Sequence, residues 1–567
     1  MVPPYFLEIE MNDFRIKCTN SAIIIDNYNL GESLKLEHMF SKYDPITHKY
    51  SLEAVYYDEE NKRLYIPGGT DLYRIKKYLN ETYYTRLSPE PYEKTTTIKM
   101  KYGPRDQEQI QALSFMCGIN DYEDIQNANQ KMLSLTTGKG KTYCSIATIG
   151  FFQVKSIIIT DSNTLLTQWK DNILEYTNLT ESDIFSINGS DLCNMILNGS
   201  SKKAENASIY LCSHGTLRSF GSRYGWEKLY ELFKYLKIGI KFFDEAHLTF
   251  DNMLMIDYFT NVWKTYYVTA TPARSDNREN QIFQISLKNV PMIDLFNKDK
   301  DPHTSYICIK WNSNPSAKDI SYCKHPVYRF DRNKYIHYLI RKPEFYDMLR
   351  VAMDLILKCV EKGGRVLIYI GTNEGILAVY KWMNNYYPEI LGDVGIFTSI
   401  VEKEEKLVNK ATKKILLSTS KSAGVGQHID GLKMTMVIAE PYKSKVLAQQ
   451  SLGRTRDNDS FYIEFLDMGF KYTMKYYYDK LPTFNKYAKD VSDTVIDKYE
   501  LKKRSENIQE ARINKLDESP IYFSDDRFDY PGIEYIKSPD ELNGVNYNSP
   551  IRFIEPGSAK NEFFGDH

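Results

Sequence analysis

Short runs of apolar residues alternate with longer amphipathic stretches over much of this chain. Between residues 96 and 300 the apolar runs have the length of buried strands, and the stretches between them have helical periodicity. The runs are 131–135, 156–160, 208–212, 239–243 and 265–268. This alternation predicts βαβ units arranged around a parallel sheet.

A second series of the same kind begins near residue 360. Its apolar runs are 365–370, 414–418, 435–439 and 461–466. The segments that start at Ser156 and Arg365 share one plan, in which an apolar strand leads through a Thr/Asn turn into an amphipathic helix. These helices are expected to open near Asn163 and Asn373. We therefore expect two similar α/β domains in tandem.

The two ends of the chain have different patterns. Residues 1–93 combine short strand-like segments with an amphipathic stretch, which predicts a small α+β module, and a linker rich in Pro and Thr follows. Beyond about residue 480 the chain is polar, with helix expected through 491–513 and then a tail rich in Pro, Asp and Tyr. The predicted domains are 1–95 (N-terminal accessory), 96–300 (first α/β), 301–480 (second α/β) and 481–567 (helical extension and partly disordered tail).

Composition narrows the class of protein. The 567 residues carry 73 Lys and Arg against 74 Asp and Glu, so any surface for a polyanion must be a local patch. The eight Cys form no C-x-x-C pair and no zinc-type cluster, which favours reduced thiols. No apolar run is long enough to span a bilayer, and Glu8 and Glu10 stand where a secretory leader needs a basic flank. We expect a cytoplasmic protein without a membrane segment.

A glycine-rich turn separates the run 131–135 from a helical stretch that reaches Phe152. Its glycines let backbone N–H groups surround phosphate oxygens, while Lys141 brings charge to the β and γ phosphates and Thr142 offers a hydroxyl to Mg²⁺. The full phosphate-loop pattern has glycine at position 135, where Leu135 stands, so the match is to its second half. We expect ATP and Mg²⁺ here, with candidate ligands Thr137, Gly138, Lys139, Gly140, Lys141 and Thr142.

Two carboxylates follow the apolar run 239–243. Asp244 and Glu245 open the sequence D-E-A-H, which ends at His247. A carboxylate at the carboxyl edge of a parallel strand can hold Mg²⁺, while its neighbour orients and activates the attacking water. We assign the metal to Asp244, together with Thr142, and the water to Glu245.

Four motifs in this order resemble superfamily 2 helicases and translocases of the DEAH type. They are G-K-G-K-T (138–142), D-E-A-H (244–247), V-T-A-T-P-A-R-S-D (268–276) and Q-S-L-G-R-T-R (450–456). The third motif and the second half of the chain look most like the DNA-acting group, which holds XPB-like proteins, restriction-enzyme motor subunits and the phage branch-migration helicase UvsW. The resemblance covers about residues 100 to 480 and implies two tandem RecA-like domains, of which 96–300 binds ATP. It also implies that an extra N-terminal domain serves in DNA recognition.

The resemblance implies further roles. The residues that would couple hydrolysis to strand movement are His247, Thr269 and Thr271, and the second domain would complete the catalytic set with Gln450, Arg454 and Arg456. The residues that would contact nucleic acid are Gln168, Trp169, Ser213, Thr216, Arg274 and Thr419, while Gly426 would touch the nucleotide. Arg105 would lie beside the adenine.

Two assignments stay open because this chain departs from the family pattern. Arg456 comes one residue early, so either it or Arg454 could be the arginine that reaches the γ-phosphate. The adenine-reading segment is also shifted, so either Gln107 or Gln109 could face the base. Tyr pairs such as Tyr83–Tyr84 could stack on bases, but Tyr is so frequent here that packing is favoured.

The resemblance implies an ATP-dependent DNA helicase or translocase that remodels branched or partly single-stranded DNA in replication, recombination or repair, encoded by a phage and acting in the host cytoplasm. Its expected partners are single-stranded, forked or branched DNA and proteins of replication or recombination. An RNA helicase is the nearer alternative, and RNA binding stays open. A restriction-type motor that translocates without strand separation is another alternative. A scaffold that has lost hydrolysis is a third, although the intact Lys141, Asp244 and Glu245 argue against it.

Overall fold

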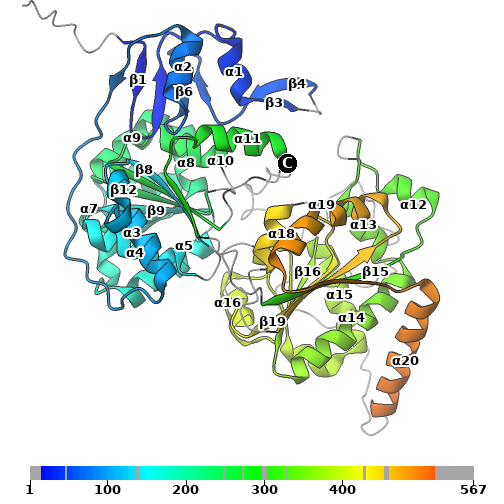
Figure 1. Cartoon of the computed structure of the whole chain (residues 1–567). Helices are drawn as coiled ribbons and strands as arrows, with labels where there is room; N and C mark the ends of the chain where they lie inside the picture. The colour runs from blue at the N-terminus through cyan, green and yellow to red at the C-terminus, as the bar shows by residue number, and fades with distance from the viewer. Residues whose placement is uncertain are drawn as a thin grey trace, which may run out of the picture. The chain divides into compact units, whose positions relative to one another are not determined.

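The computed structural model describes residues 14–44, 47–135, 139–161, 163–246, 250–270, 272, 274, 276–295, 303–326, 329–424, 429–442, 444–452 and 459–516. The chain divides into two compact units, Met1–Lys298 and Asp299–His567. Each unit is built around a large parallel sheet, as Figure 1 shows.

The large sheet of the first unit has seven strands in the order β10-β11-β9-β12-β13-β8-β14, all parallel. The strands are β8 (Gln130–Ser134), β9 (Ser156–Thr160), β10 (Ile184–Ile187), β11 (Ile209–Ser213), β12 (Ile240–Asp244), β13 (Lys264–Thr269) and β14 (Met292–Asp294). The helices are α3 (Gln107–Cys117), α4 (Lys141–Phe152), α5 (Asn163–Tyr176), α6 (Ser190–Leu197), α7 (Lys202–Asn206), α8 (His214–Tyr224), α9 (Trp226–Tyr235), α10 (Phe250–Tyr258) and α11 (Asn277–Ser286). Helices cover both faces, so Ile157 and Ile159 pack in one core and Ile158 in the other.

An N-terminal module precedes this sheet. Its five-stranded mixed sheet has the order β5-β6-β2-β1-β7, and β3 and β4 form a separate hairpin. The strands are β1 (Ile16–Cys18), β2 (Ala22–Ile25), β3 (Ser41–Asp44), β4 (Lys49–Leu52), β5 (Tyr56–Asp58), β6 (Arg63–Pro67) and β7 (Thr85–Arg86), and the helices are α1 (Leu34–Phe40) and α2 (Leu72–Leu79).

The module shares a continuous hydrophobic core with the first α/β domain. The rings of Tyr65 and Phe259 lie 4.9 Å apart, and the Tyr258 hydroxyl donates to the Ala54 carbonyl oxygen at 2.7 Å. Because successive strand residues point to opposite faces, Tyr65 on β6 faces α10 while Leu64 and Ile66 lie on the other face of the small sheet. The module is thus fixed on one side of the α/β domain within the first unit.

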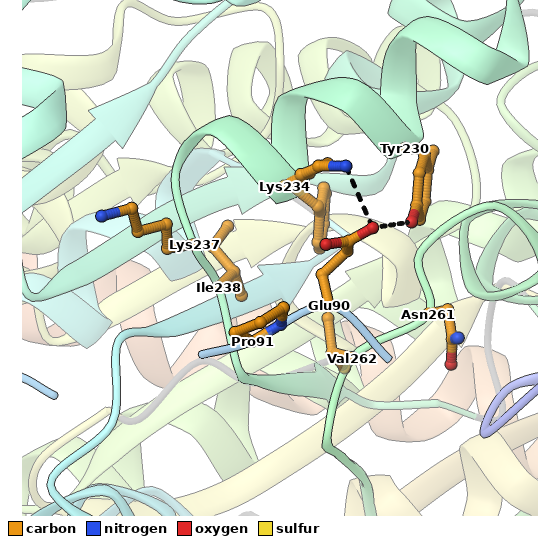
Figure 2. Close-up of a pocket in the computed structure, with 9 residues that line it drawn as sticks. Glu90, Pro91, Tyr230, Lys234, Lys237, Ile238, Asn261 and Val262 are labelled. Atoms are coloured by element: carbon orange, nitrogen blue, oxygen red, sulfur yellow. Dashed lines mark hydrogen bonds and ion pairs between the residues drawn. The ribbon is translucent and has the colours of Figure 1, made fainter. Parts of the chain in front are cut away.

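The segment that joins the module to the α/β domain is held down by one carboxylate. Glu90 accepts hydrogen bonds from the Tyr230 hydroxyl at 2.8 Å and from Lys234 Nζ at 3.0 Å, both on α9 (Figure 2). Pro91 and Val262 line the same small pocket. This linker is therefore packed onto the domain rather than extended away from it.

A buried ion pair also joins the module to the sheet. Lys241 on β12 pairs with Asp257 at 2.5 Å, and its Nζ donates to the Ser21 hydroxyl of the module at 3.0 Å. Asp257 in turn accepts from the Tyr267 hydroxyl at 2.6 Å. Burial lowers the pKa of Lys241, and the Asp257 carboxylate opposes that shift.

Replacing Lys241 with Met is expected to lower the free energy of unfolding of the first unit by about 3–5 kcal/mol, because it leaves Asp257 charged and buried without a cation. Urea unfolding of the full chain, followed by intrinsic fluorescence, measures the change. Lys203, exposed on α7, provides the matched control, since Lys203→Met removes a solvated charge. Equal midpoints for the two variants would contradict a stabilising role for the buried pair.

The large sheet of the second unit has the order β17-β18-β16-β19-β20-β15-β21, again all parallel. The strands are β15 (Thr304–Trp311), β16 (Arg365–Ile370), β17 (Val394–Ile396), β18 (Ile415–Ser418), β19 (Leu432–Ala439), β20 (Ser460–Asp467) and β21 (Val491–Val495). The helices are α12 (Ala317–Tyr322), α13 (Arg332–Leu339), α14 (Pro343–Glu361), α15 (Asn373–Tyr386), α16 (Lys403–Thr412), α17 (Ser420–Gly424), α18 (Lys445–Leu452), α19 (Lys471–Tyr487) and α20 (Lys498–Leu516). Numbered by chain order within each sheet, both sheets have the same order, 3-4-2-5-6-1-7.

The expected helix over 491–513 is only partly right. Val491–Val495 forms the edge strand β21, paired with β15, and α20 begins at Lys498 and packs against α14. The five residues of β21 are all exposed, so no alternation of apolar and polar positions marks the strand in the sequence. Pairing with the open edge of β15 determines its conformation instead.

The structure confirms the predicted fold class, with two tandem RecA-like parallel-sheet domains, a small α+β N-terminal part and a helical C-terminal region. The domain boundaries at residues 95, 300 and 480 stay predictions. In the part of the chain that the structure describes, no helix is both long and apolar enough to cross a bilayer.

Candidate active site

The described part of the predicted phosphate loop, from Lys139 to Thr142, lies at the start of α4, the helix that follows β8 at the carboxyl edge of the first sheet. Gly140 has φ +95°, and a Cβ at this position would lie 2.2 Å from Gln109 Nε2, so glycine is required there. Lys141 and Thr142 are the first two residues of α4, whose free N–H groups and helix dipole favour an anion. Thr137 and Gly138 lie outside the described residues.

The predicted acidic pair lies beside this loop. Asp244 ends β12, and Glu245 follows with φ +50°, a left-handed backbone that a non-glycine residue adopts only when its surroundings impose it. Both carboxylates are buried, and Glu245 Oε1 lies 3.3 Å from Lys141 Nζ. Burial, together with the neighbouring Glu245, raises the pKa of Asp244 to about 6, against the opposing effect of Lys141. The structure thus brings the predicted lysine and both predicted carboxylates together.

Trp169 orients the carboxylate that is assigned to the metal. Its indole Nε1 donates to Asp244 Oδ2 at 2.9 Å, and the side chain is only 2% exposed. In this structure the ring is buried against Asp244, and its predicted contact with nucleic acid stays a prediction. Gln168 beside it is half-buried.

Replacing Trp169 with Phe is expected to raise the Mg²⁺ concentration needed for half-maximal ATP hydrolysis about tenfold or more. Phenylalanine keeps most of the ring but removes the N–H that holds Asp244, and loss of such an outer contact commonly weakens a metal site 10- to 100-fold. A Mg²⁺ titration at fixed ATP measures the shift. The buried Trp311 of the second unit offers a matched control, Trp311→Phe, for which no shift is expected.

The backbone around Thr269 connects the two motifs. Leu135, which leads into the phosphate loop, donates its N–H to the Thr269 carbonyl oxygen at 3.0 Å. Ala246, directly after the acidic pair, donates to the Val268 carbonyl oxygen at 3.1 Å. A backbone movement at the phosphate loop or at the acidic pair would therefore be transmitted to the end of β13. The predicted coupling role of Thr269 needs such a connection. The other predicted coupling residues, His247 and Thr271, lie outside the described residues.

The two glutamines of the predicted adenine segment have different environments. Gln109 is buried, and its side chain bridges the Arg105 N–H at 2.8 Å and the Lys139 carbonyl oxygen at 3.0 Å. Gln107 is exposed at the start of α3, as is Arg105 just before it. Gln109 therefore positions the phosphate loop, whereas Gln107 and Arg105 remain accessible to a ligand. The Lys139 ammonium lies 3.5 Å from Glu108.

Three predicted nucleic-acid residues have local roles in the first unit. The Ser213 hydroxyl caps α8 by accepting from the Thr216 N–H at 3.2 Å, and the Thr216 hydroxyl accepts from the Gly189 N–H at 3.4 Å. Arg274 pairs with Glu279 at 3.0 Å, and Glu279 also pairs with Lys42 of the module. Arg274 thus connects the motif after β13 with the N-terminal module.

The residues predicted in the second unit are only partly described. The Thr419 hydroxyl accepts from the Ser422 N–H at 3.1 Å and so caps α17. Gln450 lies in α18, but its side chain is not described. Gly426, Arg454 and Arg456 lie outside the described residues.

Sequence reasoning missed three contacts at this site: Lys141 with Glu245, Trp169 with Asp244, and Gln109 with Lys139. Each joins residues that are at least 30 positions apart in the chain. One feature of the sequence pointed to the contact between Trp169 and Asp244. Trp169 lies on the helix that follows β9, and β9 is the neighbour of β12 in the sheet.

Comparisons with known proteins agree with this geometry. Residues 99–274 match the family described as type III restriction enzyme, res subunit. A stretch of 148 residues, 26% of this chain, is 24% identical to a putative DNA 3'-5' helicase Rad25 of Haloarcula marismortui. The chain spans about a fifth (21%) of the length of that curated relative.

Two solved structures are also similar. T4 UvsW shares 13% identity at a TM-score of 0.32, over 85% of this chain and all of that one. Dbp5 of S. cerevisiae, bound to RNA and ADP BeF3, shares 15% identity at a TM-score of 0.48, over 71% of this chain and 93% of that one. At these scores, neither likeness bears on the function of this chain.

The phosphate loop, the acidic pair and the family match lie within the same α/β domain. This stretch of the chain is therefore similar to superfamily 2 helicase domains. The assignment of this domain to the DEAH type stays a prediction, because it rests on the sequence D-E-A-H at 244–247 alone.

Proposed function

We propose that this chain is a nucleic-acid-dependent ATPase that works as a DNA helicase or translocase. The observation that carries the proposal is the convergence of Lys141, Asp244 and Glu245 at the carboxyl edge of the first sheet, where open α/β sheets bind their ligands. The family match over 99–274 supports the same class of enzyme.

The loop side of this site fits a phosphate chain. Lys141 Nζ is buried and lies 3.3 Å from Glu245 Oε1 without a hydrogen bond to it, so phosphate oxygens can compete with Glu245 for its donors. Gly140 keeps the backbone open at the point where a side chain would collide with Gln109. The N-terminus of α4 adds unpaired N–H groups directed at the same place.

The acidic side fits Mg²⁺ held partly by the nucleotide. Asp244 would supply one carboxylate and Thr142 one hydroxyl. Within the described residues, no group of three acidic, His or Cys side chains could bind a metal ion without the nucleotide. Mg²⁺ is commonly bound by one or two carboxylates plus substrate phosphates, and when bound it neutralises charge on the transferred phosphoryl group. Trp169 keeps the Asp244 oxygens in a fixed orientation.

Glu245 has the position of the catalytic base. It neighbours Asp244 at the strand end, and its carboxylate contacts Lys141, so a phosphate that attracts Lys141 would release Glu245 to accept a proton from water. Glu245 has a left-handed backbone (φ +50°), and its carboxylate lies 3.3 Å from the Lys141 ammonium at the phosphate loop.

We further propose that the substrate is branched or partly single-stranded DNA, remodelled in replication, recombination or repair, and that the protein is phage-encoded. The order of the four motifs and the third motif, T-A-T-P-A-R-S-D, support a DNA-acting enzyme. With a net charge of −1, the chain needs a local basic surface for this task.

The test is the steady-state ATPase rate of the full chain with single-stranded DNA, duplex DNA, forked DNA and matched RNA, each against no polymer. Strong stimulation by forked or single-stranded DNA supports the proposal. Stimulation by RNA alone would make the protein an RNA helicase, and stimulation by duplex without strand separation would make it a translocase. A flat rate with every polymer would contradict nucleic-acid dependence.

A further inference from the structure

We propose that Lys131, a buried lysine on β8, is a positioning residue for the nucleotide site and acts by holding the last turn of α3 in place. Lys131 lies outside the four motifs that carry the chemistry. The inference rests on the proposed function, because ATP is the ligand whose binding it concerns.

Lys131 supplies hydrogen bonds that the end of α3 needs. A helix leaves its last carbonyl oxygens without partners from its own backbone. The Lys131 Nζ donates to the Phe115 carbonyl oxygen at 3.0 Å and to the Met116 carbonyl oxygen at 3.2 Å. The Tyr266 hydroxyl, on β13, donates to the same Met116 oxygen at 2.9 Å. Two polar side chains of the sheet therefore hold the carboxyl end of α3.

The positive charge of Lys131 suits this place. Its side chain is buried, and it lies at the negative end of the α3 helix dipole. Gly118 ends the helix in a left-handed conformation, and its N–H donates to the Ser114 carbonyl oxygen at 2.9 Å. An ammonium group makes stronger hydrogen bonds to carbonyl oxygens than a neutral amine does. Protonated Lys131 therefore holds α3 more firmly than the neutral form would.

Lys131 loses its proton at a lower pH than an exposed lysine does. Burial and the neighbouring Lys264 lower the pKa of Lys131 to about 8, against smaller opposing effects of Cys117 and Asp124. These groups act on it from β13, from the end of α3 and from the segment that follows α3. As the pH rises through this pKa, the anchor of α3 therefore loses its charge.

Helix α3 connects this anchor to the phosphate loop. At its amino end, the Gln109 side chain accepts from the Arg105 N–H and donates to the Lys139 carbonyl oxygen at 3.0 Å. A Cβ at Gly140 would lie 2.2 Å from Gln109 Nε2, so the loop packs directly against the helix. Because Lys131 lies on the strand that precedes this loop, strand, loop and helix form a closed series of contacts. A displacement of α3 would displace the Lys139 carbonyl as well.

Apolar packing of α3 does not replace this anchor. Ala112, Phe115 and Met116 of the helix lie in the same core as Leu133 of β8. Hydrophobic contacts are non-directional, so they keep the helix on the sheet without fixing its position along its axis. Hydrogen bonds are directional, so those from Lys131 fix the last turn relative to β8. Loss of Lys131 should therefore change the geometry of the nucleotide site while the domain stays folded.

The experiment measures the equilibrium affinity of the full chain for a fluorescent ATP analogue with Mg²⁺ between about pH 7 and about pH 9.5. KM and kcat for ATP are measured at pH 7, with and without single-stranded DNA. Lys131→Met and Tyr266→Phe each remove a donor to α3. The matched controls are Lys264→Met, whose ammonium binds carbonyl oxygens outside α3, and Tyr267→Phe, whose hydroxyl binds a carboxylate. Thermal unfolding shows that each variant is folded at the assay temperature.

Lys131→Met is expected to weaken ATP binding and to raise KM about tenfold at pH 7, while kcat stays within about twofold of wild type, because the nucleotide is misplaced but the reacting groups are intact. Tyr266→Phe should give a smaller loss in the same direction, since Lys131 still donates to Met116. Both controls should keep the wild-type KM. As the pH rises through the pKa of Lys131, wild type is expected to lose affinity about threefold or more, so that its advantage over Lys131→Met narrows.

Three results would overturn the inference. The first is wild-type KM and ATP affinity in both Lys131→Met and Tyr266→Phe. The second is an equal loss of ATP affinity in the two controls. The third is an advantage of wild type over Lys131→Met that stays constant across the pH range, because a lysine that only fills the core would give that result.

The two proposals fail separately. If the ATP affinity depends on Lys131 as expected but no polymer stimulates hydrolysis, the proposed motor function fails and this inference stands. If polymers stimulate hydrolysis but wild type and Lys131→Met have the same KM at every pH, the inference fails and the function stands. A wild-type protein that binds no ATP analogue at any pH would overturn both.

Discussion

Replacing Glu245 with Gln is expected to lower the rate of ATP hydrolysis by about 10²–10⁴-fold while ATP binding persists. Glutamine keeps the shape of the side chain but cannot accept a proton from water. It also removes the charge that contacts Lys141 at 3.3 Å, so the lysine is left available to phosphate. Steady-state turnover and equilibrium binding of a fluorescent ATP analogue, measured on the same preparation, separate the two effects.

Glu108→Gln is the matched control for this change. Glu108 is another carboxylate beside the loop, and it contacts Lys139 at 3.5 Å rather than Lys141. Its replacement should leave turnover within a few-fold of wild type, because it has no place beside Asp244. Normal turnover in Glu245→Gln would show that another group is the base.

Replacing Lys141 with Ala is expected to weaken ATP binding and hydrolysis together, by about 100-fold or more. The buried Nζ is the charged donor at the loop, and charge-assisted hydrogen bonds contribute about 1.5–3 kcal/mol each. The change also leaves the buried Glu245 without its cation. ATP affinity by calorimetry and turnover at saturating ATP provide the measurement.

Lys139→Ala tests whether the position of the lysine matters. Lys139 stands two residues earlier in the same loop, but its ammonium contacts Glu108. We expect a much smaller loss of ATP affinity for this variant. The opposite ranking, with Lys139→Ala the more damaging change, would contradict the assignment of Lys141 to the phosphates.

Much of the fold could be predicted from local pattern because buried parallel strands are continuous apolar runs. The strands 156–160 and 365–370 were predicted with their observed bounds, and α5 and α15 begin at Asn163 and Asn373 as expected. The polar edge strand β21 could not be predicted, since its conformation depends on the open edge of β15 rather than on its own residues. Edge strands β10 and β17 were missed as well.

The candidate site was predictable to the extent that its chemistry lies in contiguous motifs. Lys141, Asp244 and Glu245 each follow a strand, and parallel topology brings the carboxyl ends of strands to one edge. The contacts of Trp169 and Arg274 depend on which side chains meet across the sheet or at the N-terminal module, and neither is visible in local sequence.

The surface of the N-terminal module illustrates a different limit. The high frequency of Tyr favoured half-buried packing for Tyr83 and Tyr84. In the structure Tyr83 stacks on Phe14 and is 66% exposed, while Tyr84 lies beside Lys76 and is 40% exposed. Periodicity identified the buried side of α2 through Ile75, but it could not tell whether another element covers the opposite side. Only the tertiary arrangement shows that this side faces solvent.

The most direct test of the central claim is the ATPase rate of wild type and Glu245→Gln at saturating ATP and Mg²⁺, with and without single-stranded or forked DNA. We predict strong stimulation of wild type by the DNA and loss of both basal and stimulated hydrolysis in the variant. Equal rates with and without any DNA would contradict a DNA-dependent ATPase, and a variant that is stimulated as wild type is would contradict the assignment of the catalytic base to Glu245.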